Sequence, residues 1–206
     1  MKRMLLAVII GLPMAALSQS AALDEKVEKF LKEHRSEWHD LNVPFVDGQT
    51  LHDIIVKKGY KSALEIGTST GHSTIWIAWA MSKTGGKVTT IELSEERHNQ
   101  AIKNLTEAGL IQFVDARLGN AHELVKQLPG PFDFVFSDAD KNWYAQYFID
   151  VTPKLVTGGC YTAHNVIDGN TPREYVESVQ KNTKFETTID KKSRAGIMIS
   201  YKLKGD

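Results

Sequence analysis

Asp138 and Lys141 combine a carboxylate with an amine three residues apart, directly after an apolar run that ends at Phe136. A carboxylate can bind a metal ion, and a lysine can accept a proton when burial or a nearby cation lowers its pKa. A helix cap followed by a surface lysine would show the same residue types. The pair is therefore a candidate for such chemistry, and a simple turn is the alternative.

His164 and Asn165 follow the next apolar run and add an imidazole and an amide. Three interpretations are open. Asp138, His164 and Asn165 bind a divalent metal together, which we favour; His164 acts as a general base without metal; or His164 only ends the strand. Imidazole suits zinc, iron, nickel or copper, whereas magnesium prefers oxygen ligands, so magnesium does not follow from these residues.

A glycine-bearing turn follows the first apolar run, and its glycines, Gly67 and Gly71, stand where a helix should begin. Their spacing lacks the middle glycine that gives a dinucleotide pyrophosphate room, so a nucleoside without a diphosphate fits better. Glu92 ends the next run, where a carboxylate can accept hydrogen bonds from ribose hydroxyls. A small-residue turn over 119–122 could hold the edge of an adenine. Together these features predict a nucleoside site.

The candidate side chains follow different apolar runs, so they can form one site only if a sheet brings the ends of its strands together. Apolar runs over 62–66, 87–91, 111–116, 132–136 and 159–163 each lead to a turn and usually a helical segment. Such alternation predicts a parallel sheet covered by helices on both faces. Two last runs, 185–189 and 195–203, have only a short connection between them, so we expect them to pair antiparallel.

Local signals mark the ends of the helices. Asp24 is a plausible cap for an amphipathic helix over 24–34. Ser94 can cap a helix that ends at Gly109, and Pro172 suits the first position of another helix. These signals place helices between the predicted strands.

The composition fits one globular domain without a nucleic-acid surface. The chain has 206 residues, 42% of them hydrophobic, and its 25 basic residues equal its 25 acidic ones. A nucleic-acid surface normally shows as a basic excess, so a small neutral or anionic partner is the better expectation.

The first residues have the layout of a secretory signal peptide, with two basic residues before an apolar stretch over 4–17 and small residues after it. A bilayer-spanning helix needs roughly 20 apolar residues, so cleavage is favoured over a permanent anchor. We expect a signal peptide over 1–18, cleaved between 18 and 22, and an exported or periplasmic domain over 23–206 that does not contact the membrane. A plain first helix of a cytoplasmic protein is the alternative.

In their order along the chain, these motifs resemble the cation-dependent O-methyltransferases of the catechol and caffeoyl-coenzyme A type, over roughly residues 25–203. The motifs are Asn42-Val43-Pro44, Asp47-Gly48-Gln49, Glu65-Ile66-Gly67, Ser73, Glu92, Ala121, Asp138-Ala139-Asp140-Lys141 and Gly158-Gly159. The implied fold is α/β and Rossmann-like, that of class I methyltransferases. It has a mostly parallel seven-stranded sheet, an antiparallel C-terminal hairpin and helices on both faces.

The resemblance implies S-adenosylmethionine as the cofactor and a hydroxyl of a small, catechol-like aromatic molecule as the methyl acceptor. The implied cofactor contacts are Val43, Glu65, Gly67, Thr68, Ser73, Glu92, Ala121 and Asp140. Asp138 would bind a divalent metal, and Lys141 would take the proton of the acceptor. The resemblance also suggests a homodimer.

One position departs from the family pattern. The family usually has an aspartate before the asparagine, where this chain has His164, so the identity of the metal and the need for it are in doubt. Two rival functions stay open. One is a metal-independent methyltransferase that uses His164 as its base, and the other is an exported binding protein that keeps the fold without turnover.

Overall fold

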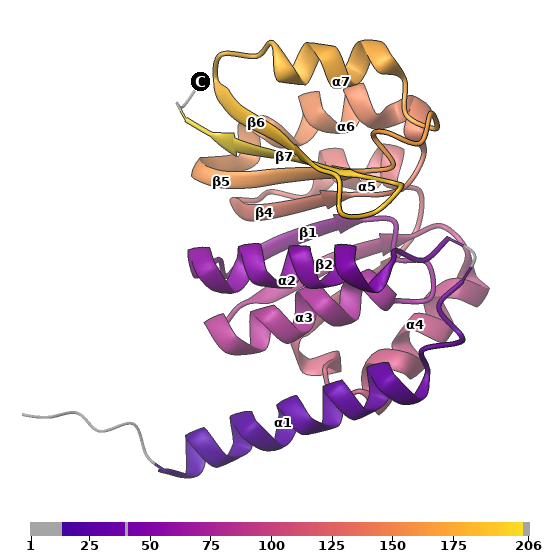
Figure 1. Cartoon of the computed structure of the whole chain (residues 1–206), viewed down its shortest axis with the longest axis vertical. Coiled ribbons are helices and arrows are strands. Elements are labelled where there is room, and N and C mark those ends of the chain that lie inside the picture. Colours follow the sequence, from indigo (N-terminus) through magenta and orange to yellow (C-terminus); the bar gives the residue numbers. More distant parts are fainter. Residues whose placement is uncertain (1–13, 40, 204–206) are drawn as a thin grey trace, which may run out of the picture.

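The computed structural model describes residues 14–39 and 41–203, with side chains from Ser20 onward. Seven strands form one sheet, in the order β3-β2-β1-β4-β5-β7-β6 (Figure 1). The strands are β1 (Ser62–Ile66), β2 (Lys87–Glu92), β3 (Val114–Leu118), β4 (Phe132–Ser137), β5 (Leu155–His164), β6 (Phe185–Asp190) and β7 (Ile197–Lys202). Strands β1 to β5 pair in parallel, and β7 is antiparallel to both β5 and β6. This confirms the predicted sheet and its C-terminal hairpin.

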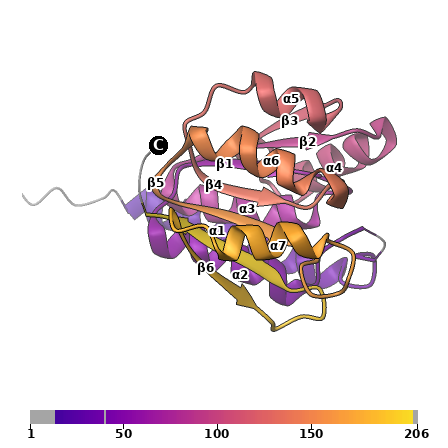
Figure 2. The same cartoon turned by 90° about the horizontal axis from the view of Figure 1, so that it is seen from above.

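Helices cover both faces of the sheet (Figures 1 and 2). They are α1 (Met14–Glu33), α2 (Phe45–Lys58), α3 (His72–Thr84), α4 (Glu95–Glu107), α5 (Ala121–Gln127), α6 (Tyr144–Val151) and α7 (Arg173–Gln180). Short 3₁₀ turns are η1 (Ile111–Phe113), η2 (Lys141–Trp143) and η3 (Thr152–Lys154). Helices α1 to α3 lie on one side and α5 to α7 on the other.

Side chains that alternate along the strands build two separate cores. Ala63 and Phe134 belong to the core under α1, α2 and α3, whereas their neighbours Leu64 and Val135 belong to the core under α5, α6 and α7. Successive strand residues point to opposite faces, so burial of both sets gives continuous apolar strands. This explains why the runs read as apolar throughout.

The turn between β1 and α3 packs against the end of β4. Gly67 has φ 102°, and a Cβ added there would lie 2.7 Å from the backbone oxygen of Asp138. Gly71 has φ 97°, and a Cβ there would lie 3.3 Å from the Cβ of Ala101 in α4. Glycine fits both the left-handed conformation and the close approach. The two glycines therefore bring the predicted nucleoside turn beside Asp138.

Three local predictions need correction. The third run begins with the 3₁₀ turn η1, and β3 starts only at Val114. Asp24 is not a cap, because α1 begins at Met14 in an alanine-rich stretch that favours helix. Its carboxylate instead accepts from the Trp79 indole at 2.7 Å and pairs with Lys83, which fixes α1 on α3. Pro172 is the N-cap residue of α7 rather than its first residue.

The predicted signal peptide falls mainly on residues 1–13, which lie outside the described residues. The rest of it, and the predicted cleavage positions, fall within the start of α1. In the part of the chain that the structure describes, no helix is both long and apolar enough to cross a membrane.

Candidate active site

A cavity of about 960 Å³ lies at the carboxyl ends of β1, β2, β4 and β5. Ligands of open α/β sheets bind at this edge. Eight of the predicted site residues line the cavity. They are Gly67, Glu92, Ala121, Asp138, Asp140, Lys141, His164 and Asn165. The fold thus brings the predicted nucleoside and proton-transfer residues to one space.

Glu92, at the end of β2, is fixed by three backbone N–H groups. Its Oε1 accepts from Leu93 N at 3.0 Å and Ser94 N at 2.9 Å, and its Oε2 accepts from Ser69 N at 2.7 Å. A carboxylate oxygen that accepts one hydrogen bond retains a second lone pair. Oε2 is therefore an oriented acceptor for a hydroxyl of a ligand in the cavity.

Asp140 and His122 shape the wall beside Ala121. Asp140 accepts from Asn142 N at 3.0 Å, and its Oδ2 lies 3.3 Å from Nε2 of His122. The His122 ring stacks on Trp143 with centroids 4.1 Å apart. Both His122 and Asp140 line the cavity. The wall is therefore a flat aromatic surface with a carboxylate at its edge. The sequence predicted a turn over 119–122 but gave His122 no role of its own.

Three predicted contacts lie behind the wall of the cavity. Thr68 is buried and its hydroxyl lies 2.6 Å from that of Thr90, while Ser73 is buried in the first turn of α3. Val43 is buried, and its carbonyl oxygen lies 2.8 Å from Nδ1 of His72. Their side chains support the turn rather than line the cavity.

Glu65 also lies behind the wall, on β1. It is fully buried, and its Oε2 accepts from Thr74 at 2.5 Å and from Thr90 at 2.6 Å. Burial raises the pKa of this carboxyl to about 7, although the hydroxyl donors act in the opposite direction. Glu65 therefore holds the start of α3 against β2.

The raised pKa of Glu65 predicts a pH-dependent stability. Between pH 4.5 and 7 the folded protein keeps a proton that the unfolded chain releases, so the free energy of unfolding falls as pH rises through this window. The loss is on the order of 3 kcal/mol, since one pKa unit corresponds to about 1.4 kcal/mol. Glu65→Gln should remove this loss, which urea unfolding at pH 4.5 and 7.5 measures.

The matched control is Glu28→Gln, because Glu28 is exposed on α1. The stability of Glu65→Gln relative to the parent protein should increase with pH, and that of Glu28→Gln should not. Equal pH dependence of the two variants would contradict the assignment.

A row of charged groups begins with Lys141, Asp138 and His164, which line the cavity, and continues behind its wall. Nζ of Lys141 lies 2.5 Å from Oδ1 of Asp138, and Oδ2 of Asp138 lies 3.1 Å from Nδ1 of His164. Nε2 of His164 lies 2.8 Å from Oδ2 of Asp47, which also accepts from Ser193 at 2.7 Å. The row joins α2, the ends of β4 and β5, and the loop before β7.

The carboxylates of Asp138 and Asp47 determine the protonation state of His164. Burial lowers the pKa of its imidazole, but the hydrogen bonds and negative charges of Asp138 and Asp47 outweigh burial and raise the pKa to about 9. The protonated ring is therefore favoured at neutral pH. A protonated imidazole has no lone pair with which to accept a proton.

The same geometry bears on metal binding. Both ring nitrogens of His164 face carboxylate oxygens, and Nδ2 of Asn165 donates to Asp168 at 2.7 Å. Within residues 14–39 and 41–203, no group of three histidine, cysteine, aspartate or glutamate side chains is arranged to hold a metal ion. Asp138 and His164 are in contact, and Asn165 follows His164 directly, so the three predicted ligands are neighbours and their binding of a metal stays a prediction.

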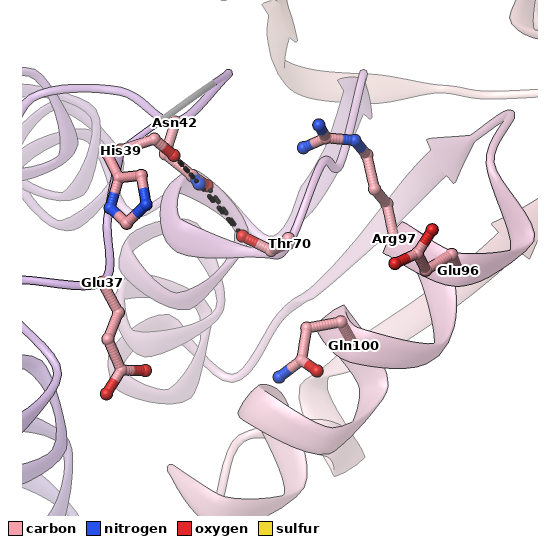
Figure 3. Close-up of a pocket in the computed structure, with 7 residues that line it drawn as sticks. All are labelled: Glu37, His39, Asn42, Thr70, Glu96, Arg97 and Gln100. Carbon is pink, nitrogen blue, oxygen red and sulfur yellow. Dashed lines mark hydrogen bonds between the residues drawn. The ribbon is translucent and has the colours of Figure 1, made fainter.

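A second cavity, of about 320 Å³, lies between the chain before α2 and the start of α4. Figure 3 shows Asn42 and Thr70 facing each other, and Asn42 Nδ2 donates to Thr70 at 3.0 Å. Arg97 lines both cavities and donates to the Ser69 hydroxyl at 3.1 Å. These contacts hold the chain before α2 and the start of α4 against the turn between β1 and α3.

Comparisons with known proteins agree with this geometry. Residues 15–199 match the O-methyltransferase family model. The chain belongs to the O-methyltransferase family. A catechol O-methyltransferase from Niastella koreensis is 36% identical over 146 residues, which cover 63% of this chain and 66% of that protein. Tricin synthase 2 from rice, Oryza sativa, is 29% identical over 172 residues, which cover 81% of this chain and 57% of that protein. The matches thus span less than two thirds of these relatives.

Two solved O-methyltransferase structures share the fold over nearly the whole chain. TomG from Streptomyces achromogenes, in complex with S-adenosylmethionine, has a TM-score of 0.72 and 26% identity, with 93% of this chain and 96% of that chain covered. The Bacillus cereus enzyme, in complex with S-adenosylhomocysteine, has a TM-score of 0.72 and 27% identity, with 95% and 93% covered. The Rossmann-like methyltransferase fold and the family resemblance are therefore confirmed.

Proposed function

We propose that this O-methyltransferase family member transfers a methyl group from S-adenosylmethionine to a hydroxyl of a small, catechol-like aromatic acceptor. The observation that carries the proposal is one cavity that contains both the oriented carboxylate of Glu92 and the Lys141–Asp138 pair. The N. koreensis relative, a catechol O-methyltransferase, supports this choice of acceptor.

Bound S-adenosylmethionine supplies a methyl group on a positively charged sulfur. Oε2 of Glu92 would accept a hydrogen bond from a ribose hydroxyl, and the wall at Ala121 and His122 would hold the adenine. These residues would hold the cofactor in the same cavity as Lys141 and Asp138. Such positioning supplies several kcal/mol of the rate acceleration.

Lys141 is the group that receives the proton of the acceptor. The neutral amine of Lys141 takes the hydroxyl proton of the acceptor and becomes an ammonium. The oxygen–carbon bond forms as the carbon–sulfur bond breaks, so the positive charge moves from sulfur to Lys141. Asp138, 2.5 Å from Nζ, stabilises the ammonium that results.

The family resemblance implies a divalent metal on Asp138, His164 and Asn165. In this structure the two ring nitrogens of His164 contact the carboxylates of Asp138 and Asp47, and no step of the proposed reaction is assigned to a metal.

The test is incubation of the full chain with S-adenosylmethionine and a panel of catechols, followed by mass spectrometry. We expect a monomethyl ether and S-adenosylhomocysteine in equal amounts. Cofactor binding without methylation of any catechol would contradict the proposed acceptor and favour the rival binding protein.

We also propose that residues 1–18 direct export and that the protein forms a homodimer. The basic and apolar layout of the leader supports the first proposal, and the family resemblance supports the second. Fractionation of cells that express a C-terminally tagged chain tests export, and analytical ultracentrifugation tests dimerisation. Tagged protein that is uncleaved and found only in the cytoplasm would contradict export, and a sedimenting monomer would contradict the dimer.

A further inference from the structure

Arg97 lies where the two cavities meet. It belongs to the first turn of α4 and lines both cavities, together with Asn42. Its Nη1 donates to the hydroxyl of Ser69 at 3.1 Å. In Figure 3 the Arg97 side chain extends from α4 on the side where Asn42 and Thr70 face each other. The guanidinium is therefore held beside the turn between β1 and α3.

A positive charge at this place does not suit the helix itself. The first turn of a helix favours negative groups, and Glu95 and Glu96 fit that preference, whereas Arg97 does not. Residues that break a local rule of this kind are found mainly at functional sites. The position of Arg97 therefore favours a negatively charged ligand in the adjoining cavity.

Ser69 connects Arg97 with the carboxylate of Glu92. Its N–H donates to Oε2 of Glu92 at 2.7 Å, while its hydroxyl accepts from Arg97. Ser69 has φ 50°, a left-handed conformation that residues other than glycine rarely adopt. Backbone strain of this kind is common at ligand sites, where surrounding contacts maintain it. The turn thus brings a carboxylate and a guanidinium to one residue, and both groups line the larger cavity.

The proposed cofactor carries a group to match each of them. Its ribose has hydroxyls that can donate to Glu92, and its amino-acid end has a carboxylate that is ionised at neutral pH. A carboxylate that leaves water without a partner is costly, so the site must supply donors. Of the described lysines and arginines, Lys141 and Arg97 line the larger cavity. Lys141 is paired with Asp138 at 2.5 Å and serves the acceptor, which leaves Arg97 for the carboxylate.

We infer that Arg97 binds the carboxylate at the amino-acid end of S-adenosylmethionine, and that Ser69 orients the guanidinium for this contact. The inference rests on the proposed function. Arginine has five N–H donors in a planar fork that matches a carboxylate, so it can bond to Ser69 and to the ligand together. Glu92 and Arg97 thus hold the cofactor at two points, which restricts the position of the sulfur between them.

The experiment compares two ligands that differ only by this carboxylate. They are S-adenosylhomocysteine and its decarboxylated analogue, which ends in an aminopropyl group. Each ligand is titrated by calorimetry into the full chain and into Arg97→Met. The substitution should weaken binding of S-adenosylhomocysteine by about 10- to 100-fold, the range for a hydrogen bond to a charged group. It should leave binding of the decarboxylated analogue nearly unchanged.

Two further variants make the comparison specific. Arg97→Lys keeps the charge but lacks the planar fork, so it should lose less affinity for S-adenosylhomocysteine than Arg97→Met does. Arg173→Met is the matched control, because Arg173 is exposed on α7 and is not among the residues that line the two cavities. It should bind both ligands as the parent protein does.

Equal weakening of both ligands in a folded Arg97→Met would overturn the inference, since it would show that Arg97 only supports the turn through Ser69. Unchanged binding of S-adenosylhomocysteine would overturn it as well. Circular dichroism establishes that each variant folds, and Arg97→Lys serves for the same comparison if Arg97→Met does not fold. Failure of the proposed function is distinguishable, because it would appear in the parent protein as absent cofactor binding or absent methylation.

Discussion

Replacement of Lys141 by methionine is expected to lower kcat by about 10²- to 10⁴-fold, the range for loss of a positioned general base. Nζ of Lys141 lies on the floor of the cavity, 2.5 Å from Asp138. Methionine retains much of the length of the side chain but cannot accept a proton. The dissociation constant of S-adenosylmethionine should stay nearly unchanged, since Glu92 and the wall at Ala121 are untouched. Steady-state kinetics and cofactor titration measure the two quantities.

A second substitution at Lys141 distinguishes its role as a base from the effect of its positive charge. Arginine keeps the positive charge beside Asp138 but does not deprotonate at ordinary pH. Lys141→Arg should therefore be nearly as inactive as Lys141→Met. The control is Lys126→Met, on the outer side of α5, which should keep full activity. If Lys141→Arg retained most of the activity, Lys141 would act through its charge alone, and its role as the base would be wrong.

Glu92→Ala is expected to weaken S-adenosylmethionine binding by about 100-fold. A hydrogen bond to a charged group contributes about 1.5–3 kcal/mol, and 1.4 kcal/mol corresponds to a factor of ten. The substitution also removes the acceptor of the Ser69 and Ser94 N–H groups, which loosens the turn that lines the cavity. Equilibrium dialysis with labelled cofactor measures the dissociation constant.

The matched control is Glu95→Ala. Glu95 is an exposed acid in the first turn of α4, three residues from Glu92, so its loss changes the local charge by the same amount. The affinity of Glu95→Ala should stay close to that of the parent protein. Equal affinities of Glu92→Ala and Glu95→Ala would show that Glu92 does not bind the cofactor.

The sheet and the edge that holds the cavity could be predicted because their signals are local. Each strand is an apolar run followed by a turn, and Gly67 and Gly71 mark the turn that must approach other backbone. Parallel strands place their carboxyl ends at one edge, so Glu92 and Asp138 were expected together. Both line the cavity.

The contacts of His164 with Asp138 and Asp47 could not be predicted, because these residues are far apart in the sequence. Asp47 precedes His164 by 117 positions, and Ser193 comes from a loop near the end of the chain. Asp47 belongs to the Asp47-Gly48-Gln49 motif of the family resemblance, but nothing local in the sequence placed it beside His164. Because these partners were unknown, three roles stayed open for His164: a general base, a metal ligand or a residue that only ends the strand.

The burial of Glu65 behind the wall of the cavity could not be predicted from the sequence either. A strand buried on both faces does not show which of its residues face the ligand and which face a helix. The pairing of Glu65 with Thr74 and Thr90 depends on how α3 and β2 pack. The extent of α1 differs for another reason, since its alanines favour helix beyond the predicted cap.

The central claim is that the cavity at the ends of β1, β2, β4 and β5 is a functional cofactor site. Calorimetric titration of S-adenosylhomocysteine into the full chain, once with chelator and once with Mn²⁺, tests it most directly because no acceptor has to be known. The account predicts saturable binding at one site per chain with micromolar affinity. A correctly folded protein that binds none, with or without added divalent metal, would contradict it.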